Sequence, residues 1–295
     1  MTYFAAMSRV DNSLTTLLRN VSVEVTPVDT TSIEAASKVL PAQTEVFIAC
    51  PRSVGSKPII SAAVRLREAN MIPVAHLPAR NLSDEFELTS LLERLSGEAE
   101  VTRVLVVGGD RDVPAGPYDC GLQIIRAGLL ERYGIRTVYL PCYPEDHPRI
   151  ETAKLEASRR EKLAVARNAG FQIGFISQFC FEPEPIIALA KRLRGHGPVP
   201  YRVGVVGPVS HGKLLKYALM CGVGPSIRAL RERRNLAKNM LSRENPEQLL
   251  REIAIAKATD ATLGISGIHF FTFGALAASA DFINRMTGIQ KSEVK

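Results

Sequence analysis

The chain has 295 residues, of which 46% are hydrophobic, and its formal net charge is +7. This length allows a large buried core in two domains or in one α/β barrel. The positive charge fits a polyanionic small ligand as well as nucleic acid, but the few aromatic residues, without any Trp, and the lack of a recognisable nucleic-acid motif argue against nucleic acid.

The expected strands and helices alternate along the chain. Strands are predicted within residues 21–27, 45–52, 71–81, 101–110, 135–148, 172–181, 201–212 and 265–276. Helices are predicted over residues 31–40, 56–70, 82–95, 118–133, 149–168 and 184–194, followed by a long helical region that is broken at 222–226 and ends at 259. This order predicts a parallel (β/α)8 TIM barrel. Because no linker interrupts it, we expect one domain over residues 1–295, with residues 1–20 as an N-terminal arm.

Several other classes of protein are excluded or disfavoured. The five cysteines are scattered and form no CxxC pair, which argues against a disulfide framework and a structural zinc site, and we expect no metal. Neither GxGxxG nor GxxxxGK[ST] occurs, so no dinucleotide fold of the usual kind and no P-loop is indicated. No apolar stretch could span a bilayer and the N-terminus lacks the features of a secretory signal, so we expect a cytoplasmic protein that binds no membrane.

Polar residues follow the predicted strands. In a barrel the carboxyl ends of all strands meet at one mouth, which is where barrel enzymes place their chemistry. The residues at these ends are Glu24, Arg52, His76, Asp110, Tyr143 with His147, Gln178, Ser210 with His211, and Thr272. Their convergence from independent strands predicts an active site.

Glu24 is the sharpest candidate, because it lies inside a strand otherwise rich in Val. A carboxylate there points into the barrel or carries a desolvation cost of several kcal/mol. A buried acid with a raised pKa can donate a proton near neutral pH. The structural alternative is that Glu24 faces a polar layer or pairs with a basic residue.

The remaining candidates have equally plain structural alternatives. Asp110 follows two glycines that permit close approach of a planar ligand, but it could be an ordinary turn residue. His76 and His147 could be hydrogen-bonded structural histidines, and Gln178 could serve only the loops of the barrel. His269 lies within a strand and is interpreted as structural.

Short motifs at the predicted strand ends, taken together, resemble the methylenetetrahydrofolate reductase family over Val21 to Ala275. YPEDHP is the most specific of them, because it resembles the family's Tyr-Pro-Glu-x-His-Pro. The others are VEVTP, AHLPARN, GGD, AGFQIGFISQFCF, GVVGPVSHGKLLKYA and GIHFFTF.

The resemblance implies a barrel that reduces 5,10-methylenetetrahydrofolate to 5-methyltetrahydrofolate with NADH or NADPH through bound FAD. Glu24 and Asp110 would be catalytic, and Gln178 and Thr272 would bind the folate substrate. The residues implied in cofactor binding are His76, Gly108, Gly109, Asp110, Tyr118, His147, Glu156 and Lys162. The implied partners are the folate and further copies of the chain in a homo-oligomer.

Three positions depart from the family's pattern: Gly108 replaces a frequent Arg, Ala49 a usual Thr, and Ala275 a folate-binding Arg. Three alternatives therefore stay open: a flavin-independent relative, a relative that works in the oxidative direction of one-carbon catabolism, and a non-catalytic folate- or flavin-binding homologue. A fourth, RNA binding by the basic stretch Arg228 to Lys238, predicts steeply salt-dependent affinity.

Overall fold

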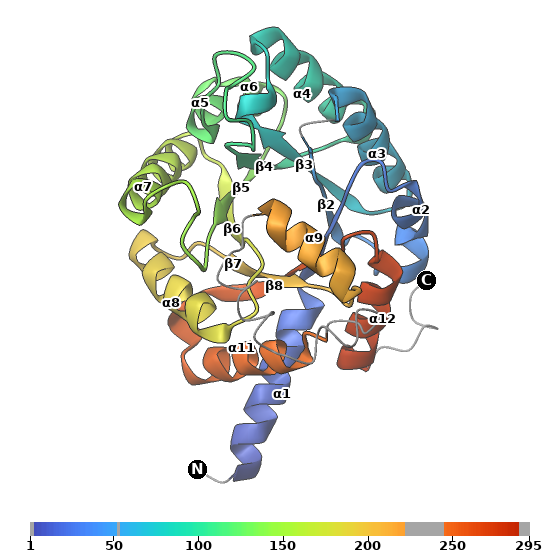
Figure 1. The fold of residues 1–295 in the computed structure, drawn as a ribbon, viewed down its shortest axis with the longest axis vertical. Coiled ribbons are helices and arrows are strands. Elements are labelled where there is room, and N and C mark those ends of the chain that lie inside the picture. Colours follow the sequence, from blue (N-terminus) through green and yellow to red (C-terminus); the bar gives the residue numbers. More distant parts are fainter. Residues whose placement is uncertain (1–2, 52–53, 222–244, 289–295) are drawn as a thin grey trace. The chain divides into compact units, whose positions relative to one another are not determined.

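The computed structural model describes residues 3–51, 54–221 and 245–288. Its strands form one closed barrel in the order β1 to β8, and helices alternate with them along the chain (Figure 1). The predicted (β/α)8 barrel is therefore confirmed. The strands are β1 (Val21–Val25), β2 (Glu45–Ile48), β3 (Ile72–Pro78), β4 (Arg103–Val107), β5 (Thr137–Cys142), β6 (Gln172–Ser177), β7 (Tyr201–Val206) and β8 (Ile265–Phe271).

The described helices match most of the expected ones within a few residues. They are α1 (Tyr3–Arg19), α2 (Thr30–Val39), α3 (Ser56–Glu68), α4 (Glu85–Ala99), α5 (Gly121–Arg126), α6 (Leu129–Arg132), α7 (Thr152–Asn168), α8 (Pro183–Leu193), α9 (His211–Cys221), α11 (Glu247–Thr259) and α12 (Leu276–Thr287), with short 3₁₀ turns η1 (Ala79–Asn81), η2 (Arg194–His196) and η4 (Ala261–Leu263). None of the helices in the described ranges is long and apolar enough to cross a membrane. The basic stretch 228–238 lies outside the described residues.

The contacts divide the chain into two compact units. The β2–β5 unit contains residues 24–141 and 153–175, and the β7–β8 unit contains residues 1–23, 142–152 and 176–295. The expectation of a single domain stays a prediction.

Parallel pairing organises the β2–β5 unit. β2 pairs with β3 from Glu45 opposite Ile72, and β3 pairs with β4 from Ala75 opposite Val104. These strands are apolar because parallel strands are buried on both faces, and α3 packs against β2, β3 and the neighbouring α4 (Figure 1). This pairing sets which side chains of neighbouring strands meet inside the unit.

One expected helix differs in the structure. The expected helix over 118–133 is two short helices, α5 and α6, because Gly128 adopts a left-handed conformation with φ of 70° between them. Residues 1–20, expected as an N-terminal arm with a short helix, contain the helix α1, which packs against α11, α12 and β8. Leu14, Leu17 and Leu18 are buried on α1, and their helical spacing explains this packing.

Gly204 of β7 packs closely against Ser177 within the β7–β8 unit. Gly204 N donates to Ser177 Oγ at 2.8 Å, and a Cβ added at Gly204 would overlap the carbonyl oxygen of Ser177. Gly204→Ala is therefore expected to lower the free energy of unfolding by about 1–3 kcal/mol. Gly97→Ala is the matched control, because an added Cβ on this exposed helical glycine meets nothing within 4 Å. Gly97→Ala is expected to raise the free energy of unfolding by about 1 kcal/mol, as measured by urea denaturation. Equal stability of the Gly204→Ala and Gly97→Ala variants would contradict the close approach of Gly204 to Ser177.

Candidate active site

An acid and an imidazole meet inside the β2–β5 unit. Glu24 of β1 and His76 of β3 place Oε2 and Nε2 3.5 Å apart, and their side chains are only 17% and 12% exposed. The ring of Phe47 from β2 stands edge-on to the His76 ring, with centroids 6.1 Å apart. The pair therefore has an apolar neighbour and little solvent.

This environment changes the acidity of Glu24. Burial raises the pKa of its carboxyl above the usual 4.5, and the nearby His76 opposes that shift without cancelling it. A carboxyl with a raised pKa keeps its proton to higher pH and can act as a general acid. Both features considered from the sequence, a buried acid and a basic neighbour, are present at Glu24.

Asp110 is exposed on the loop between β4 and α5. Gly109 before it has φ of 99°, and a Cβ added there would lie 3.2 Å from the Cβ of Pro78. The Gly108 carbonyl accepts a hydrogen bond from Arg80 N at 2.9 Å. The close approach that Gly109 allows is therefore to the chain that ends and follows β3, whereas a Cβ added at Gly108 would meet nothing within 4 Å.

Three cofactor candidates of the sequence lie elsewhere in the same unit. Glu156 and Lys162 lie on α7 on either side of Arg159, which is 7% exposed, donates to Glu156 Oε1 at 2.6 Å and lies over the Phe175 ring. Burial lowers the pKa of Lys162, with a further lowering by the positive Arg159. Tyr118 is buried, and its burial together with the carboxylates of Glu85 and Asp84 at the start of α4 raises its pKa.

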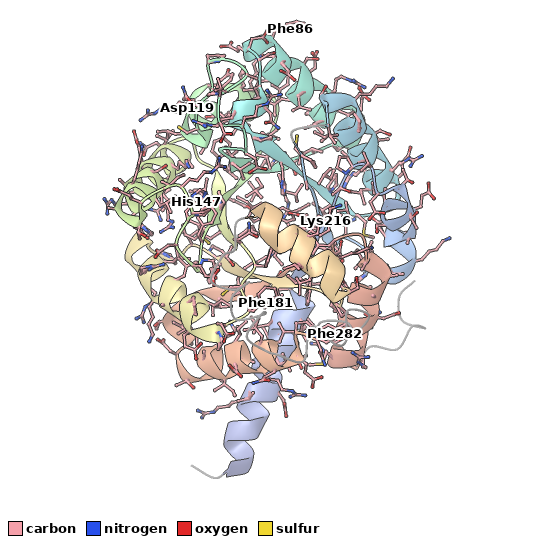
Figure 2. All side chains as sticks on the ribbon, in the orientation of Figure 1. Phe86, Asp119, His147, Phe181, Lys216 and Phe282 are labelled. Carbon is pink, nitrogen blue, oxygen red and sulfur yellow. The ribbon has the colours of Figure 1, made fainter. Side chains whose placement is uncertain are left out.

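The β7–β8 unit holds the other three candidates. His147 lies on the loop after β5 (Figure 2), edge-on to Tyr143, and its Nδ1 accepts from Arg149 N at 3.1 Å. Gln178 Oε1 accepts from the backbone of the next residue at 3.0 Å, and Thr272 is 1% exposed. His269, interpreted as structural, is fully buried with its Nδ1 2.9 Å from the Ser22 hydroxyl.

A buried polar network was missed in the sequence. Arg103 of β4 forms an ion pair with Glu45 at the start of β2, and the Tyr139 hydroxyl of β5 donates to Glu45 Oε1 at 2.6 Å. Burial lowers the pKa of Arg103, but Glu45 and Tyr139 raise it by more. The sequence signal for this network is a charged residue at the first position of two otherwise apolar strands, Glu45 in β2 and Arg103 in β4.

Cys50 follows β2 and belongs to the same unit as Glu24 and His76. Burial raises the pKa of the Cys50 thiol to about 11, despite an opposing hydrogen bond from Asn81, so Cys50 is protonated at neutral pH. Among the described residues, no three His, Cys, Asp or Glu side chains gather in a way that could hold a metal ion. The expectation of no metal stays a prediction.

Comparisons with known proteins give only distant matches. No known family model matches the chain. Solved structures with a similar fold include an oxaloacetate acetylhydrolase (13% identity, TM-score 0.47, covering 93% of this chain and 84% of that one) and a 2,3-dimethylmalate lyase of the PEP mutase/isocitrate lyase superfamily (16%, 0.44, 87% and 96%). A Yersinia pestis DHPS with a pterine-sulfa conjugate is a third (13%, 0.46, 91% and 92%). At these identities the likeness concerns the fold alone.

The predicted methylenetetrahydrofolate reductase is corrected by these comparisons. The family assignment, the oxidoreductase activity, the FAD and the NADH or NADPH donor are wrong, since the similar structures are named as a lyase and a hydrolase of other families. The flavin-independent, oxidative and non-catalytic folate- or flavin-binding alternatives are wrong with them. The motifs misled because any barrel site places short polar, Gly and Pro segments at its strand ends. Gly108, Ala49 and Ala275 also lack the polar side chains that the family uses.

Proposed function

We propose that the protein is an enzyme in which protonated Glu24 donates a proton to its substrate. The observation that carries this proposal is the buried carboxyl of raised pKa 3.5 Å from an imidazole. Burial disfavours the charged form of this carboxyl, so it keeps its proton to a higher pH than an exposed carboxyl does. Perturbed acids of this kind are concentrated at functional sites.

The two side chains have complementary roles in this proposal. The Glu24 carboxyl transfers its proton to a basic nitrogen or oxygen of the substrate and becomes a carboxylate. His76, when protonated, stabilises that carboxylate and returns a proton to it after the product leaves, taking its own proton back from water. Phe47 limits the water around the pair, which strengthens their interaction.

Asp110 is proposed as the residue that orients the substrate. Its carboxylate is exposed at the carboxyl end of β4, where it can accept hydrogen bonds from N–H or O–H groups of an entering ligand.

We further propose that the enzyme works in the cytoplasm. The four cysteines whose side chains the structure describes are free thiols, which suits a reducing compartment.

Metabolite profiling with the purified protein tests the function. A cell extract is incubated with the wild type, with Glu24→Gln and with Glu98→Gln, and small molecules are followed by mass spectrometry. Glu98 is the matched control because it is 45% exposed and pairs only locally with Arg94 on α4. We expect at least one metabolite to be consumed by the wild type and the control, and about 100-fold more slowly by Glu24→Gln. Equal consumption by Glu24→Gln, or no consumption by the wild type, would overturn the proposal.

A further inference from the structure

The side chain of Arg80 gathers several groups of the loop between β4 and α5. Arg80 lies in η1, directly after β3. Its Nη1 donates to the carbonyl oxygens of Arg111 at 2.8 Å and Asp112 at 3.1 Å, and its Nε donates to the carbonyl of Asp119 at 3.0 Å. Its Nη2 forms an ion pair with the Asp119 carboxylate. One guanidinium therefore contacts both the middle and the end of the loop.

The backbone of Arg80 contacts the same loop at two further points. Arg80 N donates to the Gly108 carbonyl at 2.9 Å, and Ala115 N donates to the Arg80 carbonyl at 3.0 Å. The contacts at Gly108 and at Arg111 bracket Asp110 along the chain. Fixing the backbone on both sides of Asp110 restricts where its carboxylate can lie.

Glycines let the loop approach closely enough for these bonds. A Cβ added at Gly116 would overlap the carbonyl oxygen of Ser83, and one added at Gly109 would press on Pro78. The loop therefore lies directly against the chain that ends β3 and leads to α4. Pro78 is the last residue of β3 and stands two positions beyond His76.

We propose that Arg80 is the positioning residue that holds Asp110 at the carboxyl end of β3, the strand that carries His76. The role of Asp110 in this inference rests on the proposed function. Arg suits the task because its planar guanidinium carries five N–H donors in a fixed fork, and a Lys ammonium cannot reach several carbonyls in this geometry. The Asp119 carboxylate on the same fork fixes the orientation of the guanidinium.

Amide hydrogen exchange tests the positioning without any substrate. In Arg80→Ala the Ala115 and Asp119 amides, which are hydrogen bonded to the Arg80 carbonyl and to Gln123 Oε1, are expected to exchange at least about tenfold faster. Arg80→Lys keeps the charge without the fork, so it is expected to restore little protection, and it serves as the second variant if Arg80→Ala does not fold. Arg94→Ala, which removes an ion pair on α4, is the control and should leave both amides unchanged.

Turnover of the metabolite found by profiling then tests the link to Asp110. Arg80→Ala and Asp110→Asn are each expected to lower kcat, and the double variant should be no slower than Asp110→Asn alone, because residues that act as one unit are not additive. Unchanged exchange in both Arg80 variants overturns the inference, and so does an additive loss of kcat in the double variant. If the wild type consumes no metabolite, the proposed function fails, whereas the exchange result still decides whether Arg80 holds the loop.

Discussion

Replacing Glu24 by Gln is expected to make the protein more stable at neutral and alkaline pH, with little change in acid. Burial raises the pKa of the Glu24 carboxyl in the folded state above the usual 4.5. The folded protein therefore binds this proton more tightly than the unfolded chain does. Its stabilising contribution is fully present below the unfolded pKa and is lost as the pH rises through the folded pKa. Gln keeps the shape and removes the ionisation, so the variant avoids this loss.

The size of the effect follows from the size of the shift. Each unit by which the folded pKa exceeds the unfolded value corresponds to about 1.4 kcal/mol. Urea unfolding of the wild type and Glu24→Gln, measured from about pH 4 to about pH 9, should show a stability difference that grows with pH and then levels off. A difference that is constant across this range would mean that Glu24 ionises in the folded state without penalty, which would remove its role as a general acid.

The same substitution is expected to raise stability at neutral pH and to slow turnover about 100-fold. Functional residues are often kept at a cost in stability, and the two effects together would separate a catalytic acid from a structural one. A structural Glu24 would instead lose stability on replacement, because its contacts with His76 would be weakened without a compensating gain.

The fold could be predicted from the sequence because each strand is a short apolar run between helical segments. Residues 101–107 show this most clearly, and β4 occupies Arg103–Val107. The exact ends of the helices were harder to predict from the sequence. The break at Gly128, for example, depends on a backbone conformation that the helical spacing of apolar residues does not indicate.

The site could be predicted only in part. Glu24 stands out because a carboxylate is exceptional among Val residues, but its pairing with His76 needs the spatial neighbourhood of β1 and β3. Arg80 was missed because its contacts reach residues about 30 to 40 positions away, and nothing in its local sequence distinguishes it from the other basic residues. The reaction was misread because the resemblance rested on short segments rather than on the contacts that those segments make.

The network of Glu45, Arg103 and Tyr139 gives the second large expected effect. Glu45 is 5% exposed, and Arg103→Met would remove the cation that faces its carboxylate. Breaking a fully buried ion pair costs about 3–5 kcal/mol, and because the Arg103 side chain is 35% exposed we expect about 2–3 kcal/mol in urea unfolding. Arg94→Ala, on the surface of α4, is the control and should leave the stability nearly unchanged.

A double substitution separates the buried charge from the packing. Glu45→Gln removes the negative charge but keeps an oxygen that can accept the hydrogen bond of the Tyr139 hydroxyl. The double variant Glu45→Gln/Arg103→Met is therefore expected to be more stable than Arg103→Met alone, with a coupling of about 0.5–3 kcal/mol between the two positions. If the two losses simply add, Arg103 stabilises the barrel through its aliphatic stem and not through Glu45. A measured coupling would mean that the charge of Glu45 is tolerated inside the strands because Arg103 faces it. At Glu24, by contrast, burial raises the pKa of the carboxyl and thereby favours its protonated form.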